Sequence, residues 1–149
     1  MHLTQEAIDA IVKQATVEYP SECCGIVTGT DTLLRVHVLA NIQDRLNAKD
    51  PEMHPRTSRE AYAVDRNEAE RIIVEATGRG ESILAFYHSH IDCGAYFSAM
   101  DREVQTVFGE PEFPDAVHIV VSVQHGAIHE IKGYLWDGRK RDFMEVAVR

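Results

Sequence analysis

The feature that most constrains the fold of this chain is a set of short apolar, β-branched runs separated by turn residues. Two such runs, 23–28 and 33–39, flank the turn-like segment Gly29-Thr30-Asp31-Thr32, which predicts a hairpin. Three more runs lie near the C-terminus and are separated by equally short turns: 116–123, 127–136 and 139–148. Strands joined by tight turns pair antiparallel. These runs therefore favour a sheet rich in hairpins over a doubly wound parallel sheet.

Three segments have the apolar periodicity of helices. Thr4 can cap a first helix, in which apolar residues recur with helical spacing at Ile8, Ile11, Val12 and Ala15. A second helix is predicted to begin at Asp65, with a glutamate three residues on as in a capping box, and to stop at Gly78. A third is predicted over 98–108, with one apolar face formed by Met100, Val104, Val107 and Phe108.

Extended runs at 61–64 and 82–90 lie between these helices. Helices and strands are therefore mixed, and hairpins outnumber crossover units. We expect an α+β fold in which residues 1–149 form a single domain, a mixed β-sheet flanked by helices. A folded chain of this length buries roughly 70% of the surface that its unfolded form exposes, so neither a disulfide nor a metal is needed to hold the core together.

Residues 40–59 are mostly polar and contain Asp50-Pro51 and His54-Pro55, in which each proline disfavours helix at the residue before it. This composition predicts a long loop. Structureless loops of this length are uncommon in compact domains and are often functional or mobile. Two interpretations stay open: a segment that contacts substrate, or a surface excursion without a role.

Charge and cysteine content exclude some functions and locations. The chain carries 15 Lys and Arg against 24 Asp and Glu, a formal net charge of −9, so its average surface repels nucleic acid and anionic membranes. The N-terminus lacks the pattern of a signal peptide, and no run approaches the ~18 apolar residues of a membrane span. The cysteines are odd in number and form no C-x-x-C pair, which is typical of a reducing cytoplasm.

The chemistry is concentrated in residues 88–101. On a strand over 82–90, His88 and His90 project from one face and Ser89 from the other. The connection that follows contains a glycine and is long enough to turn the chain back, so that Asp101 in the first turn of the next helix can meet both imidazoles. Two imidazole nitrogens and a carboxylate, with a fourth position left to water, are a typical ligand set of catalytic zinc.

Each part of this pattern also has a structural interpretation. An H-x-H pair is by itself unspecific, and Ser98-x-x-Asp101 is also the pattern of a helix capping box. Cys93 could approach the metal as a fourth ligand, which would make the site structural, or could simply pack. The other six of the eight histidines show no second ligand set.

The spacing of His88-Ser89-His90, seven residues, Ser98, two residues and Asp101 resembles the signature of the JAMM (MPN+) zinc metallopeptidases. The segment Pro20-Ser21-Glu22-Cys23-Cys24-Gly25 is similar to the family's P-x-E-x-C-G segment, and the order of elements resembles the family core over nearly the whole chain. The chain looks like one of the small, stand-alone prokaryotic members. One departure is Ile91, where family members often have proline; it indicates a different path of the following loop.

The resemblance implies a JAMM/MPN (cytidine-deaminase-like) fold and one Zn²⁺ per chain, held by His88, His90 and Asp101. It also implies that Glu22 acts as general base and acid, and that Ser98 donates a hydrogen bond to the oxyanion. The implied reaction is hydrolysis of a peptide or isopeptide bond after the C-terminal Gly-Gly of a ubiquitin-like or sulfur-carrier protein. The segment 40–59 is expected to help form the cleft. The alternative is a non-catalytic module that binds a ubiquitin-like partner.

Overall fold

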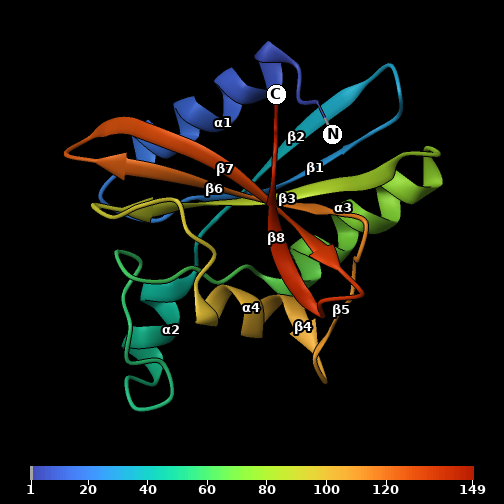
Figure 1. Cartoon of the computed structure of the whole chain (residues 1–149). Coiled ribbons are helices and arrows are strands. Elements are labelled where there is room, and N and C mark those ends of the chain that lie inside the picture. Colours follow the sequence, from blue (N-terminus) through green and yellow to red (C-terminus); the bar gives the residue numbers. More distant parts are fainter. Residues whose placement is uncertain (1) are drawn as a thin grey trace.

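The computed structural model describes residues 2–149, and its centre is a six-stranded sheet with the strand order β2-β1-β3-β6-β7-β8 (Figure 1). In chain order the elements are α1 (Gln5–Glu18), β1 (Cys24–Gly29), β2 (Leu34–Leu39), α2 (Gln43–Lys49), α3 (Arg66–Gly78), β3 (Ser82–Ile91), α4 (Ala99–Gln105), β4 (Thr106–Val107), β5 (Glu110–Pro111), β6 (Val117–Gln124), β7 (Ala127–Asp137) and β8 (Asp142–Val146).

The strands of this sheet pair antiparallel except for β3 and β6, which pair in parallel. A parallel pair needs a crossover connection, and here that connection carries α4 and the small β4-β5 hairpin. The predicted mixed sheet flanked by helices is confirmed, and so is the hairpin of β1 and β2.

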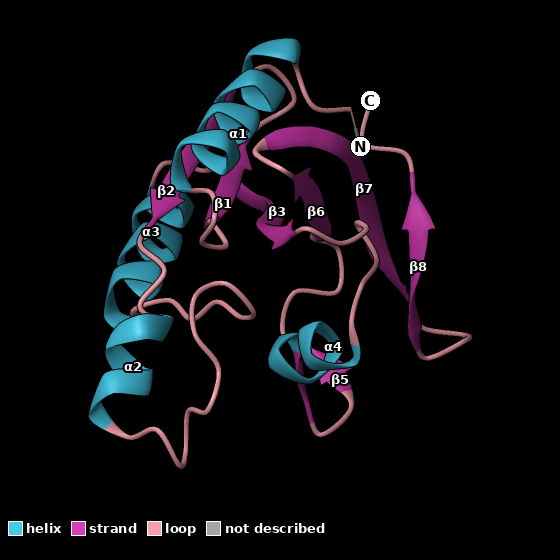
Figure 2. Cartoon of the chain, turned by 90° about the vertical axis from the view of Figure 1, so that its left-hand side faces the viewer, coloured by secondary structure: helices cyan, strands magenta, loops and turns pink. Residues whose placement is uncertain are grey.

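Helices cover both faces of the sheet, with α1 on one side and α2, α3 and α4 on the other (Figures 1 and 2). Side chains of β3 alternate between these layers: Tyr87 packs in the core beneath α1 with Ile8 and Ile11, whereas Phe86 packs against Ile72 of α3. Burying each of these large apolar side chains contributes about 1.5–3 kcal/mol. The face of β3 that is turned toward α3 and α4 is the one that carries the two histidines.

The helix starts follow the sequence signals. The Thr4 hydroxyl accepts a hydrogen bond from the Ala7 amide at 3.2 Å, and the Asp65 carboxylate accepts one from the Glu68 amide at 3.0 Å. Within residues 2–149 no helix has both the length and the apolar character needed to cross a lipid bilayer.

The prediction of an unstructured loop over 40–59 is wrong, because the segment contains α2. This helix lacks the usual signals: Ile42 at its N-cap makes no side-chain cap bond. Its buried side chain is Gln43, which donates a hydrogen bond to the backbone oxygen of Arg56 at 3.0 Å. The helix is therefore held through polar contacts within the segment, which apolar periodicity cannot detect.

Other boundaries also differ from the prediction. Helix α4 ends at Gln105; Val107 lies in β4 and the fully exposed Phe108 in the following turn, so the predicted apolar face is wrong at these two positions. Residues 61–64 join no strand, and the last strand covers only 142–146. Gly78 remains helical, while Gly80 adopts the positive φ of 77° that suits glycine.

Candidate metal and catalytic site

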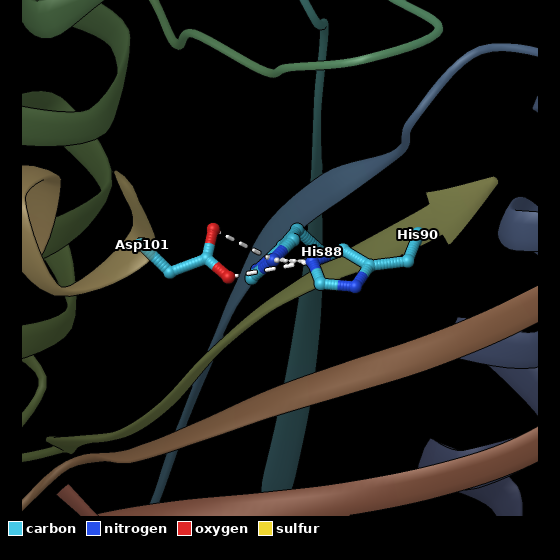
Figure 3. A group of neighbouring side chains, drawn as sticks. All are labelled: His88, His90 and Asp101. Carbon is cyan, nitrogen blue, oxygen red and sulfur yellow. Dashed lines mark hydrogen bonds and ion pairs between the residues drawn. The ribbon is translucent and has the colours of Figure 1, made fainter. Parts of the chain in front are cut away.

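The end of β3 brings two imidazoles together. His88 and His90 project from the same face, with their Nε2 atoms 3.2 Å apart (Figure 3). Ser89 points to the other face, where its hydroxyl accepts a hydrogen bond from the Cys23 amide at 2.8 Å. Both imidazoles are buried. This is the alternation expected from the sequence.

Asp101 reaches these imidazoles because the crossover from β3 to β6 carries α4 over the same face of the sheet. Its Oδ1 lies 3.2 Å from Nε2 of His88, and its Oδ2 lies 3.3 Å from Nε2 of His90. The capping box is also present: the Ser98 hydroxyl accepts from the Asp101 amide, and the Asp101 carboxylate accepts from the Ser98 amide. Both interpretations of Ser98-x-x-Asp101 are therefore compatible, since capping fixes the carboxylate that faces the imidazoles.

The three donor groups could hold a metal ion. Tetrahedral ligands at about 2.0 Å from a zinc ion lie roughly 3.3 Å from one another, and the 3.2 Å between the two Nε2 atoms matches this value, with one oxygen of Asp101 at 3.2 to 3.3 Å from each imidazole. Nδ1 of His90 lies 2.9 Å from the carbonyl oxygen of Gly94. Donation of a proton to that oxygen leaves Nε2 as the ligand atom, an arrangement common among metal-binding histidines.

Electrostatics at the three groups also suit a cation. Burial lowers the pKa of His88, which keeps its imidazole neutral and its lone pair available. Burial alone would raise the pKa of Asp101, but the contacts of its carboxylate with the imidazoles of His88 and His90 outweigh burial and hold that pKa well below the usual range. The imidazole of His88 also stacks on Tyr62, with 4.5 Å between ring centroids.

Glu22 lies beside this group because of the register of β1. Cys24 pairs with His88 in the antiparallel ladder, so the chain two residues earlier runs alongside the end of β3. The Glu22 side chain is buried, and its Oε2 has no hydrogen-bond partner among residues 2–149. Burial, together with the nearby charge of Asp101, raises the pKa of Glu22 to about 9. A buried carboxylate without a partner is costly, and such groups cluster at functional sites.

The segment 40–59 fixes the backbone of Glu22. The Glu22 amide donates to the carbonyl oxygen of Ser58 at 2.7 Å, and the Asn41 side chain donates to the carbonyl oxygen of Glu22 at 2.9 Å. Ser58 is held in turn by the carboxylate of Asp44, which accepts from its amide and its hydroxyl. Sequence reasoning missed Asn41, Asp44 and Ser58, because nothing in their spacing distinguishes them from other polar loop residues.

A cavity of about 280 Å³ lies over the donor group, and a larger groove of about 1140 Å³ adjoins it between α2, α3 and α4. Residues of both the signature and the segment 40–59 line the smaller cavity, among them Glu22, Arg56, Arg59, His90, Cys93, Ser98 and Asp101. Cys93 thus borders the site but is not one of the three clustered donors, and burial raises the pKa of its thiol. Within residues 2–149 no second group of three such donors is present.

The departure at Ile91 affects the loop after the strand. Ile91 is buried and continues the ladder by pairing with Val123 of β6. The chain turns only at Asp92, whose φ is 55° and whose carboxylate accepts hydrogen bonds from Tyr19, Arg59 and the amide of His125. His88 and His90 themselves remain on the regular strand.

Comparison with known proteins agrees with this geometry. The chain is 26% identical to the CysO-cysteine peptidase of Mycobacterium tuberculosis over 129 residues, which cover 87% of this chain and 77% of that protein. It is 26% identical to the desampylase of Haloferax volcanii, over 99% of this chain and 96% of that protein. The solution structure of protein DSY2949 from Desulfitobacterium hafniense shares the fold, with a TM-score of 0.71 and 20% identity over 99% of this chain and 90% of that one.

The family described as prokaryotic homologs of the JAB domain matches residues 4–133, which include the complete signature and Glu22. The resemblance seen in the sequence is thereby confirmed: the chain belongs to the prokaryotic JAB/MPN family.

Proposed function

We propose that this protein is a zinc-dependent peptidase that hydrolyses a peptide or isopeptide bond after the C-terminal Gly-Gly of a ubiquitin-like or sulfur-carrier protein. One observation carries the proposal: Glu22, a buried acid with one unpartnered carboxylate oxygen, borders the same small cavity as His90 and Asp101, two of the three clustered donors. A scaffold has no need for an unpartnered buried acid next to such donors, whereas hydrolysis needs a proton acceptor there.

Zinc held by His88, His90 and Asp101 would supply a Lewis acid that lowers the pKa of a water from 15.7 to about 7. Glu22 takes a proton from the attacking water and passes it to the leaving amine. The pKa of about 9 belongs to the metal-free chain, in which Glu22 is protonated near neutral pH; a cation held at the three donors would lower this pKa and free the carboxylate to accept the proton.

Ser98 is placed to stabilise the oxyanion. Its hydroxyl oxygen accepts from the Asp101 amide at 3.0 Å, and among residues 2–149 no acceptor takes its proton. The hydroxyl borders the cavity and can therefore donate to substrate. A donor of this kind contributes roughly 3 kcal/mol to stabilisation of the transition state.

The shape of the site supports a Gly-Gly tail and a folded partner. The cavity over the donors measures about 280 Å³ and is bordered by the large side chains of Tyr62, Tyr96 and Met100, which favours substrate residues without side chains. The adjoining groove lies between α2, α3 and α4 and is lined largely by apolar side chains, which suits contact with the surface of another protein. The names of the relatives, CysO-cysteine peptidase and desampylase, support a partner of the sulfur-carrier or ubiquitin-like kind.

We place the protein in the cytoplasm as part of this proposal, because its three cysteines are free thiols.

The test combines metal analysis with mass spectrometry of ubiquitin-like proteins that carry extensions after Gly-Gly. The wild type is expected to contain one zinc per chain and to cut after Gly-Gly. Glu22→Gln is expected to keep the zinc and to cut about 10²- to 10⁴-fold more slowly. Glu60→Gln is the matched control, because Glu60 also borders the cavity but is exposed. If the zinc-loaded wild type binds these proteins and cuts none, the non-catalytic alternative is the correct one.

A further inference from the structure

An arginine without an acidic partner borders the catalytic cavity. Arg56 and Arg59 both line it, although the chain as a whole carries a net charge of −9. Arg59 forms an ion pair with Asp92 at 3.0 Å. Arg56 forms no ion pair with any residue of 2–149; its guanidinium contacts the sulfur of Met100 at 3.8 Å. Arg59 is therefore neutralised by Asp92, whereas Arg56 is available to pair with an anionic group of a substrate.

The position of Arg56 is held from two sides. Its backbone oxygen accepts from the buried side chain of Gln43, and its side chain lies against Met100, the residue before Asp101. Arg56 lines both the cavity and the adjoining groove, so it lies at the junction between them. Arg56 is exposed, so its guanidinium is accessible to a ligand that enters the cavity from the groove.

Arg56 also lies near the group that serves the leaving amine. Arg56 and Glu22 both line the cavity of about 280 Å³, and the charge of Arg56 lowers the pKa of Glu22, opposing burial and the charges of Asp101 and Glu60. In the proposed reaction water adds its hydroxyl to the carbonyl carbon of the second glycine, the C–N bond breaks, and Glu22 returns a proton to the amine. A group close to Glu22 is therefore close to the leaving residue.

We propose that Arg56 is a specificity-determining residue: its guanidinium binds the free α-carboxylate of the leaving residue and so favours an α-linked terminal residue over an isopeptide-linked lysine. This inference rests on the proposed function. In an α-linked residue the carboxylate carbon lies two bonds, about 2.5 Å, from the amine nitrogen. In an isopeptide the ε-amine of lysine is separated from its own carboxyl group by the whole side chain, which places no anion at Arg56.

The chemistry of arginine suits this role. A guanidinium pairs with a carboxylate through two parallel hydrogen bonds, and such charge-assisted bonds are the strong ones. A substrate whose terminal carboxylate is converted to an amide loses the contact to Arg56 but keeps every contact of the Gly-Gly tail.

The experiment uses the full-length zinc-loaded protein and a ubiquitin-fold sulfur carrier that ends in Gly-Gly-Ala, prepared once with a free C-terminal carboxylate and once as the amide. The wild type is expected to process the acid with a kcat/KM about 10- to 100-fold above that of the amide. Arg56→Gln is expected to lower the rate for the acid to that for the amide, and to leave the amide rate within about threefold of wild type. Arg59→Gln, which removes the arginine already paired with Asp92, is expected to retain the preference for the acid.

A binding measurement separates this inference from the proposed reaction. In a Glu22→Gln background, calorimetry is expected to show tighter binding of the acid than of the amide, and Arg56→Gln is expected to remove the difference. Equal binding of the two forms, binding of neither, or a preference for the acid that survives in Arg56→Gln would overturn the role of Arg56. If the acid binds more tightly but the wild type cleaves neither form, Arg56 recognises the carboxylate and the peptidase proposal fails.

Discussion

Two buried carboxylate clusters lie at opposite ends of β3, and they differ in their partners. Glu81, directly before the strand, accepts hydrogen bonds from Arg35, Arg79 and Thr28 at 2.6 to 3.1 Å. At the other end Asp101 faces the imidazoles of His88 and His90. Glu22 lies nearby with one oxygen unpartnered.

The comparison shows how a structural cluster differs from a site. The two arginines and Thr28 donate hydrogen bonds to both oxygens of Glu81. These bonds hold the pKa of Glu81 well below the usual range. The other cluster has imidazoles that can be neutral, donor atoms at the spacing of metal ligands, and a carboxylate that retains a lone pair. The first can only tie β1, β2 and the start of β3 together, whereas the second can accept a cation and exchange a proton.

The largest expected effect comes from removing the carboxylate of the second cluster. Asp101→Ala leaves two imidazoles and no anion, so we expect loss of stoichiometric zinc and a fall in hydrolysis of more than about 10³-fold. Metal analysis and cleavage assays measure both. Glu81→Gln is the matched control and is expected to keep metal and activity; if it loses both, the distinction between the two ends of β3 is wrong.

Ser98→Ala tests the hydroxyl at the second cluster. We expect kcat to fall about 10²-fold, because the oxyanion loses a donor. We also expect a stability loss of about 1 kcal/mol, because α4 loses its cap. Ser98→Thr keeps both a hydroxyl and a cap, so it should restore most of the rate and the stability. If Ser98→Ala loses stability but keeps the kcat of the wild type, Ser98 has only the capping role.

Glu22→Gln should stabilise the metal-free protein at alkaline pH. The folded-state pKa of about 9 lies above the ordinary value of 4.5, so between these pH values the folded chain binds more protons than the unfolded chain. Wild-type stability therefore falls as pH rises through this window, and the variant lacks this component. We expect the variant to gain on the order of 1–3 kcal/mol at pH 8 and less at pH 5, measured by urea unfolding with a chelator present. Equal pH slopes in the two proteins would contradict the burial argument.

Glu81→Gln should lower the thermal unfolding midpoint by a few degrees at neutral pH. The pKa of Glu81 is lowered in the folded protein, so its stabilising contribution is present above about pH 4.5 and is lost as pH falls below that value. The difference between variant and wild type should therefore shrink at pH 3, which thermal melts followed by circular dichroism can measure. A difference that is as large at pH 3 as at pH 7 would mean that packing, not charge, stabilises this end.

The smallest effect is expected at Cys93, which borders the second cluster without joining its donors. Cys93→Ser should leave the zinc content at one per chain and kcat within about twofold of wild type, because three protein ligands and a water complete a catalytic zinc site. Loss of zinc in this variant would instead identify the thiol as a fourth ligand.

Segments with a strong local pattern could be predicted from the sequence. Helix α1 follows from the Thr4 cap and its apolar stripe, and the placement of His88 and His90 on one face follows from strand alternation. Helix α2 could not be predicted in this way, because it depends on a buried glutamine and on contacts with residues farther along the chain. Glu22 could be singled out only through the family resemblance.

What the sequence alone determined is therefore the order of the strongly patterned elements and the common face of His88 and His90, since cap bonds and side-chain periodicity act over a few residues. Only the tertiary structure decided that Ser58 and Asn41 fix the backbone of Glu22, and that Arg56 stands unpaired at the cavity while Arg59 does not. These contacts join residues 14 or more positions apart, through hydrogen bonds and charges that leave no periodic trace in the sequence.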